Sequence, residues 1–169
     1  MTIATYTRNV LGPMDYTPVT LSDNTYPHLS TYAHELAQPI VFESGIQHFA
    51  DHYNTYKALP EYAIHYLKDI PVIWDETKLI AGYPGKYTII ARRSGTTWYI
   101  GGINGESRDK ELIVDLSTLN GLSDQLAIVR DGESRNDITQ EVIDVSGEKS
   151  ISVHMKPYGG FYAISQNPE

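Results

Sequence analysis

The sequence contains no cysteine. Disulfide bonds, thiolate nucleophiles and zinc-thiolate sites are therefore excluded. The absence of cysteine does not distinguish a location in a reducing compartment from one in an oxidising compartment. Positive charge is also sparse, because 13 Lys and Arg residues stand against 21 Asp and Glu residues and give a formal net charge of −8. The basic residues are scattered, so the sequence predicts no nucleic-acid partner and no anionic membrane surface as a partner.

Long hydrophobic runs and several catalytic motifs are missing as well. No apolar stretch approaches the roughly 20 residues of a membrane span, so none is predicted. The glycine-rich segments 82–86 and 101–105 lack a P-loop ending and are predicted to be turns. A Gly-x-Ser-x-Gly elbow, which a serine hydrolase would need, is absent. The histidines match no zinc spacing, and no metal site is predicted.

The composition changes near residue 70. Residues 1–70 hold eight of the 13 Tyr and five of the six His residues, whereas residues 71–169 hold ten of the 13 Lys and Arg residues. This shift predicts a boundary between two domains, 1–70 and 71–169.

Residues 1–70 show a strand–helix–strand–helix pattern. Apolar runs at 9–16 and 46–50 predict buried strands. Ser30 can N-cap a first helix, which Pro39 would kink, and Pro60 opens a second. Two such strand–helix pairs are the unit of a parallel (β/α)8 barrel, so the fold class of this region is α/β.

Residues 71–169 show a strand period instead. Apolar and polar side chains alternate at 151–156 and partly at 111–116, and Ser94-Gly95 makes a good hairpin turn. Seven or eight strands at this spacing predict an all-β, antiparallel β-sandwich, in which Gly159-Gly160 allows close packing before the last strand.

Four segments carry a resemblance to a known family. They are 7–18 (TRNVLGPMDYTP), 32–45 (beginning YAHEL and ending FESG), 70–77 (IPVIWDET) and 98–106 (WYIGGINGE). In this order they resemble the C-terminal portion of glycoside hydrolase family 97, the α-glucosidase and α-galactosidase family. The resemblance covers nearly the whole chain.

The resemblance implies a fragment of a longer enzyme: the last two βα units of the catalytic barrel at 1–70, and the C-terminal β-domain at 71–169. Met1 is then interpreted as an internal methionine, with the rest of the barrel, the N-terminal portion of the same protein and any signal peptide upstream. The implied activity is calcium-dependent hydrolysis of terminal α-glucosidic linkages in oligosaccharides, with α-galactosidic linkages as the second choice. A periplasmic or secreted location follows from the family, and a homo-oligomer is left open.

No catalytic residue can be carried over, because the family's main carboxylates and its calcium ligands are expected upstream. We therefore expect the isolated chain to be inactive and to bind no calcium. The best candidates for lining a sugar site are Asp15, Tyr16, Asp51 and His52, which follow the two expected strands, together with Glu43. The alternative is that Asp15 and Asp51 only cap loops.

Glu35 and Glu43 would lie near one face of the same helix. We expect them to anchor that helix to neighbouring loops, with Arg8 as a candidate partner, rather than to act as a catalytic pair.

A non-catalytic module that binds carbohydrate or mediates assembly is the rival interpretation. Exposed aromatic side chains on one sheet face would favour it, since flat rings suit the apolar face of a pyranose. The candidate rings include Trp74 and Trp98. Trp98 is expected to belong to the core, because it shares one side of a predicted strand with Ile100.

Overall fold

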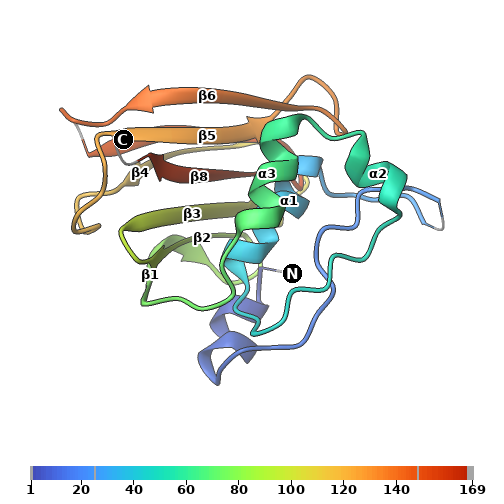
Figure 1. The fold of residues 1–169 in the computed structure, drawn as a ribbon, viewed down its shortest axis with the longest axis horizontal. Coiled ribbons are helices and arrows are strands. Elements are labelled where there is room, and N and C mark those ends of the chain that lie inside the picture. The colour runs from blue at the N-terminus through green and yellow to red at the C-terminus, as the bar shows by residue number, and fades with distance from the viewer. Residues whose placement is uncertain (1, 25, 148, 167–169) are drawn as a thin grey trace.

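The β-region is a six-stranded sheet with a smaller two-stranded sheet packed on it. The computed structural model describes residues 2–24, 26–147 and 149–166 (Figure 1). The large sheet has the order β1-β2-β3-β8-β5-β6 and the small sheet pairs β4 with β7, all antiparallel. The strands are β1 Glu76–Tyr83, β2 Tyr87–Ser94, β3 Thr97–Asn104, β4 Lys110–Asp115, β5 Gln125–Asp131, β6 Ile138–Asp144, β7 Ser150–Met155 and β8 Gly160–Gln166. The prediction of an antiparallel β-domain is confirmed.

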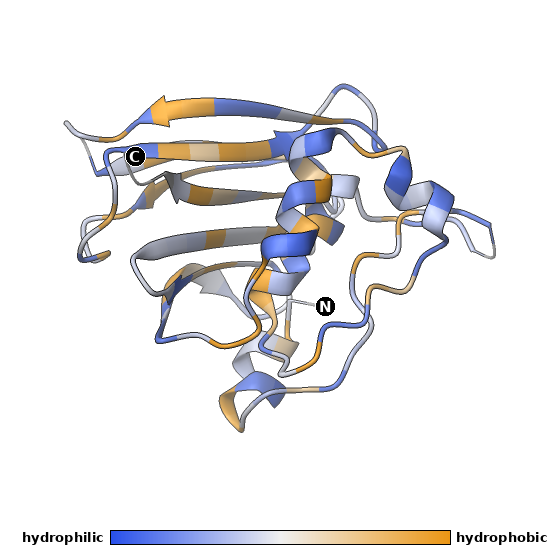
Figure 2. Cartoon of the chain, viewed as in Figure 1, coloured by the Kyte–Doolittle hydropathy of each residue, from blue (hydrophilic) through white to orange (hydrophobic). Residues whose placement is uncertain are grey.

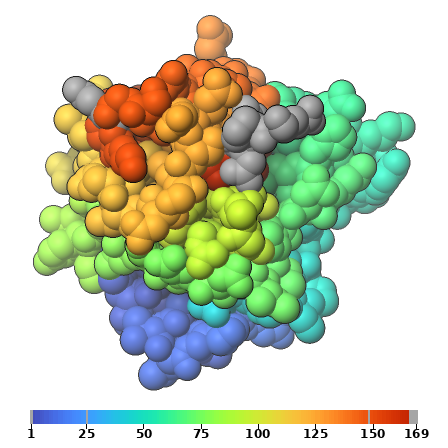
Figure 3. All heavy atoms as spheres, turned by 60° about the vertical axis from the view of Figure 1, so that its left-hand side comes forward, coloured from blue at the N-terminus to red at the C-terminus, as the bar shows by residue number. Residues whose placement is uncertain are grey.

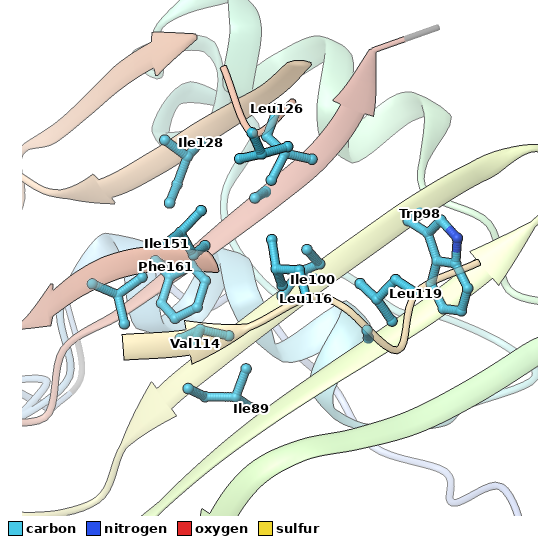
Figure 4. Packing of buried hydrophobic residues seen from close by; sticks show 14 of the residues in the cluster. Ile89, Trp98, Ile100, Val114, Leu116, Leu119, Leu126, Ile128, Ile151 and Phe161 are labelled. Atoms are coloured by element: carbon cyan, nitrogen blue, oxygen red, sulfur yellow. The ribbon is translucent and has the colours of Figure 1, made fainter. Parts of the chain in front are cut away.

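A hydrophobic core fills the space between the two sheets (Figure 4). The expected alternation places Ile151, Val153 and Met155 of β7 inward. Trp98 has an exposed fraction of 0%, and its indole Nε1 donates a hydrogen bond to the carbonyl of Asn120 at 2.9 Å. Trp98 is therefore a core residue, as predicted, with its polar atom satisfied.

The hairpin between β2 and β3 turns at Gly95. Ser94 pairs with Thr97, and Gly95 has a φ of +59°. This left-handed conformation strains an L side chain but not glycine. The turn predicted from Ser94-Gly95 is confirmed.

The N-terminal region consists of helices and loops. Its elements are two 3-10 turns, η1 Ala4–Tyr6 and η2 Arg8–Val10, and three α-helices, α1 Tyr32–Val41, α2 Tyr53–Lys57 and α3 Glu61–Asp69. Helix α3 begins where Pro60 predicted it. Helix α1 begins one residue later than expected, because Thr31 rather than Ser30 is its N-cap and accepts from the backbone N–H of His34. None of the described helices is long and apolar enough to span a membrane.

The strands predicted at 9–16 and 46–50 do not form. The described residues of 1–70 contain no strand, so they make no strand–helix unit of a barrel within this chain. Instead of lying inside a sheet, Val10 and Leu11 are exposed to 72% and 86%. An apolar run becomes a buried parallel strand only where neighbouring strands can pair with both of its edges.

Helix α1 forms the third layer of the molecule. It packs on the face of the large sheet opposite β4 and β7, and its other side is covered by α3. A Cβ atom on Gly101 of β3 would lie 2.9 Å from the Cβ of Ile40, and one on Gly160 of β8 would lie 2.8 Å from the Cα of His34. Glycine at these two positions lets the helix lie directly on the sheet, and the close packing predicted at Gly159-Gly160 is confirmed at Gly160.

Candidate functional site

Asp15 and Tyr16 lie in the extended loop that precedes α1. Asp15 is exposed and makes no side-chain hydrogen bond or ion pair with the other described residues. The hydroxyl of Tyr16 donates to the carbonyl of Gln38 at 2.9 Å, and its ring meets Phe42 edge-on with 5.3 Å between centroids. Burial raises the pKa of Tyr16, with the nearby Glu35 adding to the effect. Tyr16 thus fastens the loop to α1, while Asp15 faces solvent.

Asp51 organises a loop through its carboxylate. Its Oδ2 accepts hydrogen bonds from the backbone N–H groups of Leu21 and Ser22, at 2.5 Å and 2.6 Å. Partial burial by itself raises the pKa of Asp51, but the backbone donors of His52, Leu21 and Ser22 outweigh it and lower the pKa to about 2. Asp51 is therefore ionised in the neutral range and unsuited to donate a proton.

His52 caps the short helix α2. Its Nδ1 accepts from the backbone N–H of Asn54 at 3.3 Å, and its side chain is exposed. Asp51 and His52 are adjacent, but each interacts with a different backbone segment. Loop capping, the alternative weighed for Asp51, describes the observed contacts of both residues.

Glu43 forms an ion pair with Arg92 of β2. Arg92 has an exposed fraction of 2%, and its guanidinium donates to the carbonyl of Ile40 at 2.6 Å, to Thr77 Oγ1 at 2.8 Å and to Glu43 Oε2 at 3.3 Å. Burial lowers the pKa of Arg92, whereas Glu43 raises it. The guanidinium satisfies a backbone carbonyl that the end of α1 leaves without a helical partner, and places a positive charge at the negative end of the helix dipole.

The predicted anchoring of the helix to a neighbouring loop is confirmed for Glu35, whereas Glu43 lies outside the helix and pairs with a strand residue, so the expectation of one shared helix face is wrong, as is the suggested partner Arg8. Arg8 donates to the carbonyls of Gly12 and Pro13 instead. Glu35 accepts from the hydroxyl of Ser30 at 2.6 Å, and burial raises the pKa of its carboxyl group. Glu43 lies just beyond the end of α1, so the two acids bind different parts of the molecule.

A second anchor, which the sequence did not suggest, lies at the other end of α1. The carboxylate of Asp131 accepts from the hydroxyl of Thr31 and from the backbone N–H groups of Lys156 at 2.9 Å and Gly160 at 3.1 Å. Burial raises the pKa of Asp131. His34 Nδ1 lies 3.2 Å from the carbonyl of Gly159, and burial lowers the pKa of its imidazole to about 4. The contact between Thr31 and Asp131 joins residues 100 positions apart, which no local motif signals.

The acidic side chains do not form a metal site within the part of the chain that the structure describes. No group of three or more His, Asp or Glu residues there could hold an ion. A calcium site takes six to eight oxygen ligands, so the residues present do not fit one.

Glycoside hydrolysis requires two carboxyl groups that flank one bond. In the described structure Glu43 and Asp51 are each occupied by contacts within the chain, while Asp15 faces solvent. Three layers, with helix α1 tied to the large sheet at both ends by Arg92 and Asp131, define an antiparallel β-domain with a helix packed on it. The chain belongs to the family described as "Glycosyl-hydrolase 97 C-terminal, oligomerisation", which matches residues 73–165.

Similar proteins extend the likeness to the N-terminal region. A probable retaining α-galactosidase of Streptomyces bingchenggensis is 36% identical over 98% of this chain and 25% of its own length. The retaining α-galactosidase of Bacteroides thetaiotaomicron is 33% identical over 92% of this chain and likewise 25% of its own length. The chain thus spans about a quarter of these relatives.

Solved structures agree with the fold. A glycoside hydrolase family 97 enzyme from Pseudoalteromonas sp. strain K8, in complex with panose, superposes with a TM-score of 0.86 at 26% identity, covering 99% of this chain and 28% of that one. A β-arabinopyranosidase structure gives a TM-score of 0.84 at 27% identity, covering 94% of this chain and 26% of that one.

Proposed function

We propose that this chain is the C-terminal part of a retaining family 97 α-glycosidase that removes terminal α-galactosyl residues from oligosaccharides, with α-glucosides as the second substrate class. The observation that carries the proposal is the similarity to two retaining α-galactosidases along nearly the whole chain. It reverses the substrate order expected from the sequence, which placed α-glucosides first. The catalytic carboxylates and any calcium ligands would lie in the remaining three-quarters of such an enzyme.

The surface of the N-terminal region supports this role. Among the described residues, seven of the 13 exposed large hydrophobic side chains lie before residue 71, although that region is the shorter one. They are Ile3, Val10, Leu11, Tyr26, Leu29, Ile46 and Tyr53. Figure 2 shows that the turns nearest the N-terminus end in a hydrophobic tip, and Figure 3 shows residues of this segment projecting beyond the β1–β2 edge. We infer that this surface packs against the catalytic part of the enzyme.

A chimeric enzyme tests the proposal. The corresponding C-terminal quarter of the Bacteroides thetaiotaomicron α-galactosidase is deleted or replaced by this chain, and turnover of a nitrophenyl α-galactoside is measured. We expect the deleted enzyme and the isolated 169-residue chain to be inactive, and the chimera to be active with retention of anomeric configuration. Turnover by the isolated chain that Glu43→Gln abolishes would overturn the proposal, and so would a folded but inert chimera.

An assembly module is the second candidate, because the family description names oligomerisation. Sedimentation of the isolated chain tests it. Assembly would be favoured over support of the catalytic part by two results together: a stable dimer of the isolated chain, and equal turnover by the deleted enzyme and the chimera.

A further inference from the structure

Three dipeptides of the chain have the sequence that forms a succinimide most readily, which is Asn or Asp followed by Gly. They are Asn104-Gly105, Asn120-Gly121 and Asp131-Gly132. In this reaction the backbone nitrogen of the glycine attacks the side-chain carbonyl carbon of the residue before it. Glycine favours the attack because it has no Cβ to obstruct it. The reaction therefore needs a free side chain, a free glycine N–H and room for the ring.

The fold protects Asn104-Gly105 from this reaction. Asn104 has an exposed fraction of 0%, and its Nδ2 donates to the carbonyls of Arg108 at 2.7 Å and Lys156 at 2.9 Å. The Gly105 N–H donates to the carbonyl of Lys86 at 2.7 Å. Both reacting groups must lose these hydrogen bonds before they can meet, and breaking them inside the protein is unfavourable.

Asp131-Gly132 is protected in the same way. The Asp131 carboxylate accepts the hydrogen bonds at the start of α1 that are described above, and the Gly132 N–H donates to the carbonyl of Asp137 at 2.9 Å. The Asp137 carboxylate also packs directly against Gly132. This dipeptide therefore has neither a free nucleophile nor a free side chain.

Asn120-Gly121 lies in a β-turn and is open. The N–H of Leu122 closes the turn on the carbonyl of Leu119 at 3.3 Å. Asn120 is exposed, and neither its side chain nor the Gly121 N–H has a hydrogen-bond partner among the described residues. Gly121 has a φ of +71°, and a Cβ placed on it would meet nothing within 4 Å apart from its chain neighbours. All the requirements of the reaction are met at this turn.

The same turn is bonded to the core between the sheets. Leu119 lies beside Trp98 (Figure 4), and the backbone carbonyl of Asn120 accepts the indole N–H at 2.9 Å. If the succinimide opens at this carbonyl, the carbonyl becomes a free carboxylate, and the backbone continues through the former side chain with an added methylene. A reaction at the surface thus changes the hydrogen-bond acceptor of the largest fully buried side chain.

We propose that Asn120 is a site of spontaneous modification, with water as the co-reactant. The Gly121 nitrogen bonds to Asn120 Cγ and gives up its proton, while the bond from Cγ to the side-chain nitrogen breaks and that nitrogen leaves as ammonia. Water then opens the ring at either carbonyl, which yields aspartate or isoaspartate and adds a negative charge. These steps need no catalytic part, so the site is independent of the proposed function.

Peptide mapping by mass spectrometry tests the site in the 169-residue chain, incubated at mildly alkaline pH. We expect Asn120 to gain about 1 Da at a rate at least about tenfold higher than Asn104, because Asn104 reacts only after local opening. In urea the two asparagines should react at similar rates, since each precedes glycine. Asn120→Gln should stay unmodified, because its longer side chain closes a larger ring much more slowly.

Two results would refute the site. One is an equal rate for Asn104 and Asn120 in the folded chain, and the other is an Asn120 that stays intact in the folded chain but reacts in urea. Either result would leave the proposed function unaffected, because no turnover is involved.

Asn120→Asp is the matched control for the effect on the core, because it adds the negative charge without lengthening the backbone. The isoaspartyl form, separated by ion exchange, should melt at a lower temperature than Asn120→Asp. In a Trp74→Phe background, its Trp98 fluorescence should also differ from that of Asn120→Asp. Equal melting temperatures and equal spectra would overturn the link between this turn and the core.

Discussion

The β-region and the N-terminal region use hydrophobic residues differently. The core between the two sheets is built from residues at and after position 80. The core around α1 combines side chains of the N-terminal region, such as Leu36, with Val129, Ile138 and Tyr162 of the sheet. The β-region therefore contains a complete core of its own, whereas the N-terminal region depends on the sheet for burial and still leaves apolar side chains exposed.

The largest effect is expected for Trp98→Ala, which removes the largest fully buried side chain of the self-contained core. The loss of a fully buried indole should lower the free energy of unfolding by about 3–5 kcal/mol, out of a typical total of about 5–15 kcal/mol. Urea denaturation of the 169-residue chain measures it. Trp74→Ala, at a half-buried position outside that core, is the control and should have a smaller effect. An unchanged midpoint for Trp98→Ala, with weaker retention on an α-glucan column, would instead make Trp98 a sugar platform.

A smaller loss is expected where the two regions are joined. Arg92→Ala removes a buried guanidinium and leaves the Ile40 carbonyl without its side-chain donor, so we expect a loss of about 2–3 kcal/mol. Arg93→Ala is the matched control, because Arg93 is a more exposed neighbour on the same strand that does not contact α1. Equal midpoints for the two variants would show that the anchor at the end of α1 contributes little.

The pH dependence tests the other anchor. Burial lowers the pKa of His34 from 6.5 to about 4. Between these two pH values the imidazole is therefore protonated in the unfolded chain but neutral in the folded chain. The His34 contribution is constant above pH 6.5, and stability falls as the pH drops from 6.5 toward about 4, by up to about 1.4 kcal/mol per pH unit. His34→Gln should flatten the urea midpoint across this window. If the midpoint of the variant still falls with pH in the same way, groups other than His34 cause the pH dependence.

The last prediction concerns removal of the N-terminal region. The domain boundary at residue 70 stays a prediction, and residues 71–169 should fold on their own because their core contains no residue of the first seventy. The exposed sheet face where α1 packs should make this fragment less stable than the whole chain but still cooperative. A fragment that shows no cooperative unfolding would contradict this prediction.

The same contrast explains what could be predicted from the sequence. The alternation at 151–156 and the Ser94-Gly95 turn are local signals, and the structure confirmed both in the β-region. The runs at 9–16 and 46–50 carry apolar residues too, but periodicity cannot reveal whether a partner strand is present. The pairing of Glu43 with Arg92 spans 49 residues, so the sequence predicted an anchor but not its partner.

Whether Asp15, Tyr16, Asp51, His52 and Glu43 line a sugar site in a longer enzyme stays a prediction. The contacts seen within this chain hold loops and the end of α1 in place. Such a role is compatible with a sugar site that another part of the enzyme completes.

Hydrogen exchange tests the central claim most directly, by comparing the isolated chain with the chimeric enzyme. We expect the strands and α1 to be protected in both, because α1 is buried along nearly its whole length. The loops at 2–24 and 43–52, which carry most of the exposed apolar side chains of the N-terminal region, should gain protection only in the chimera. Equal protection of these loops in the two proteins would contradict the inference that this surface packs against a catalytic domain.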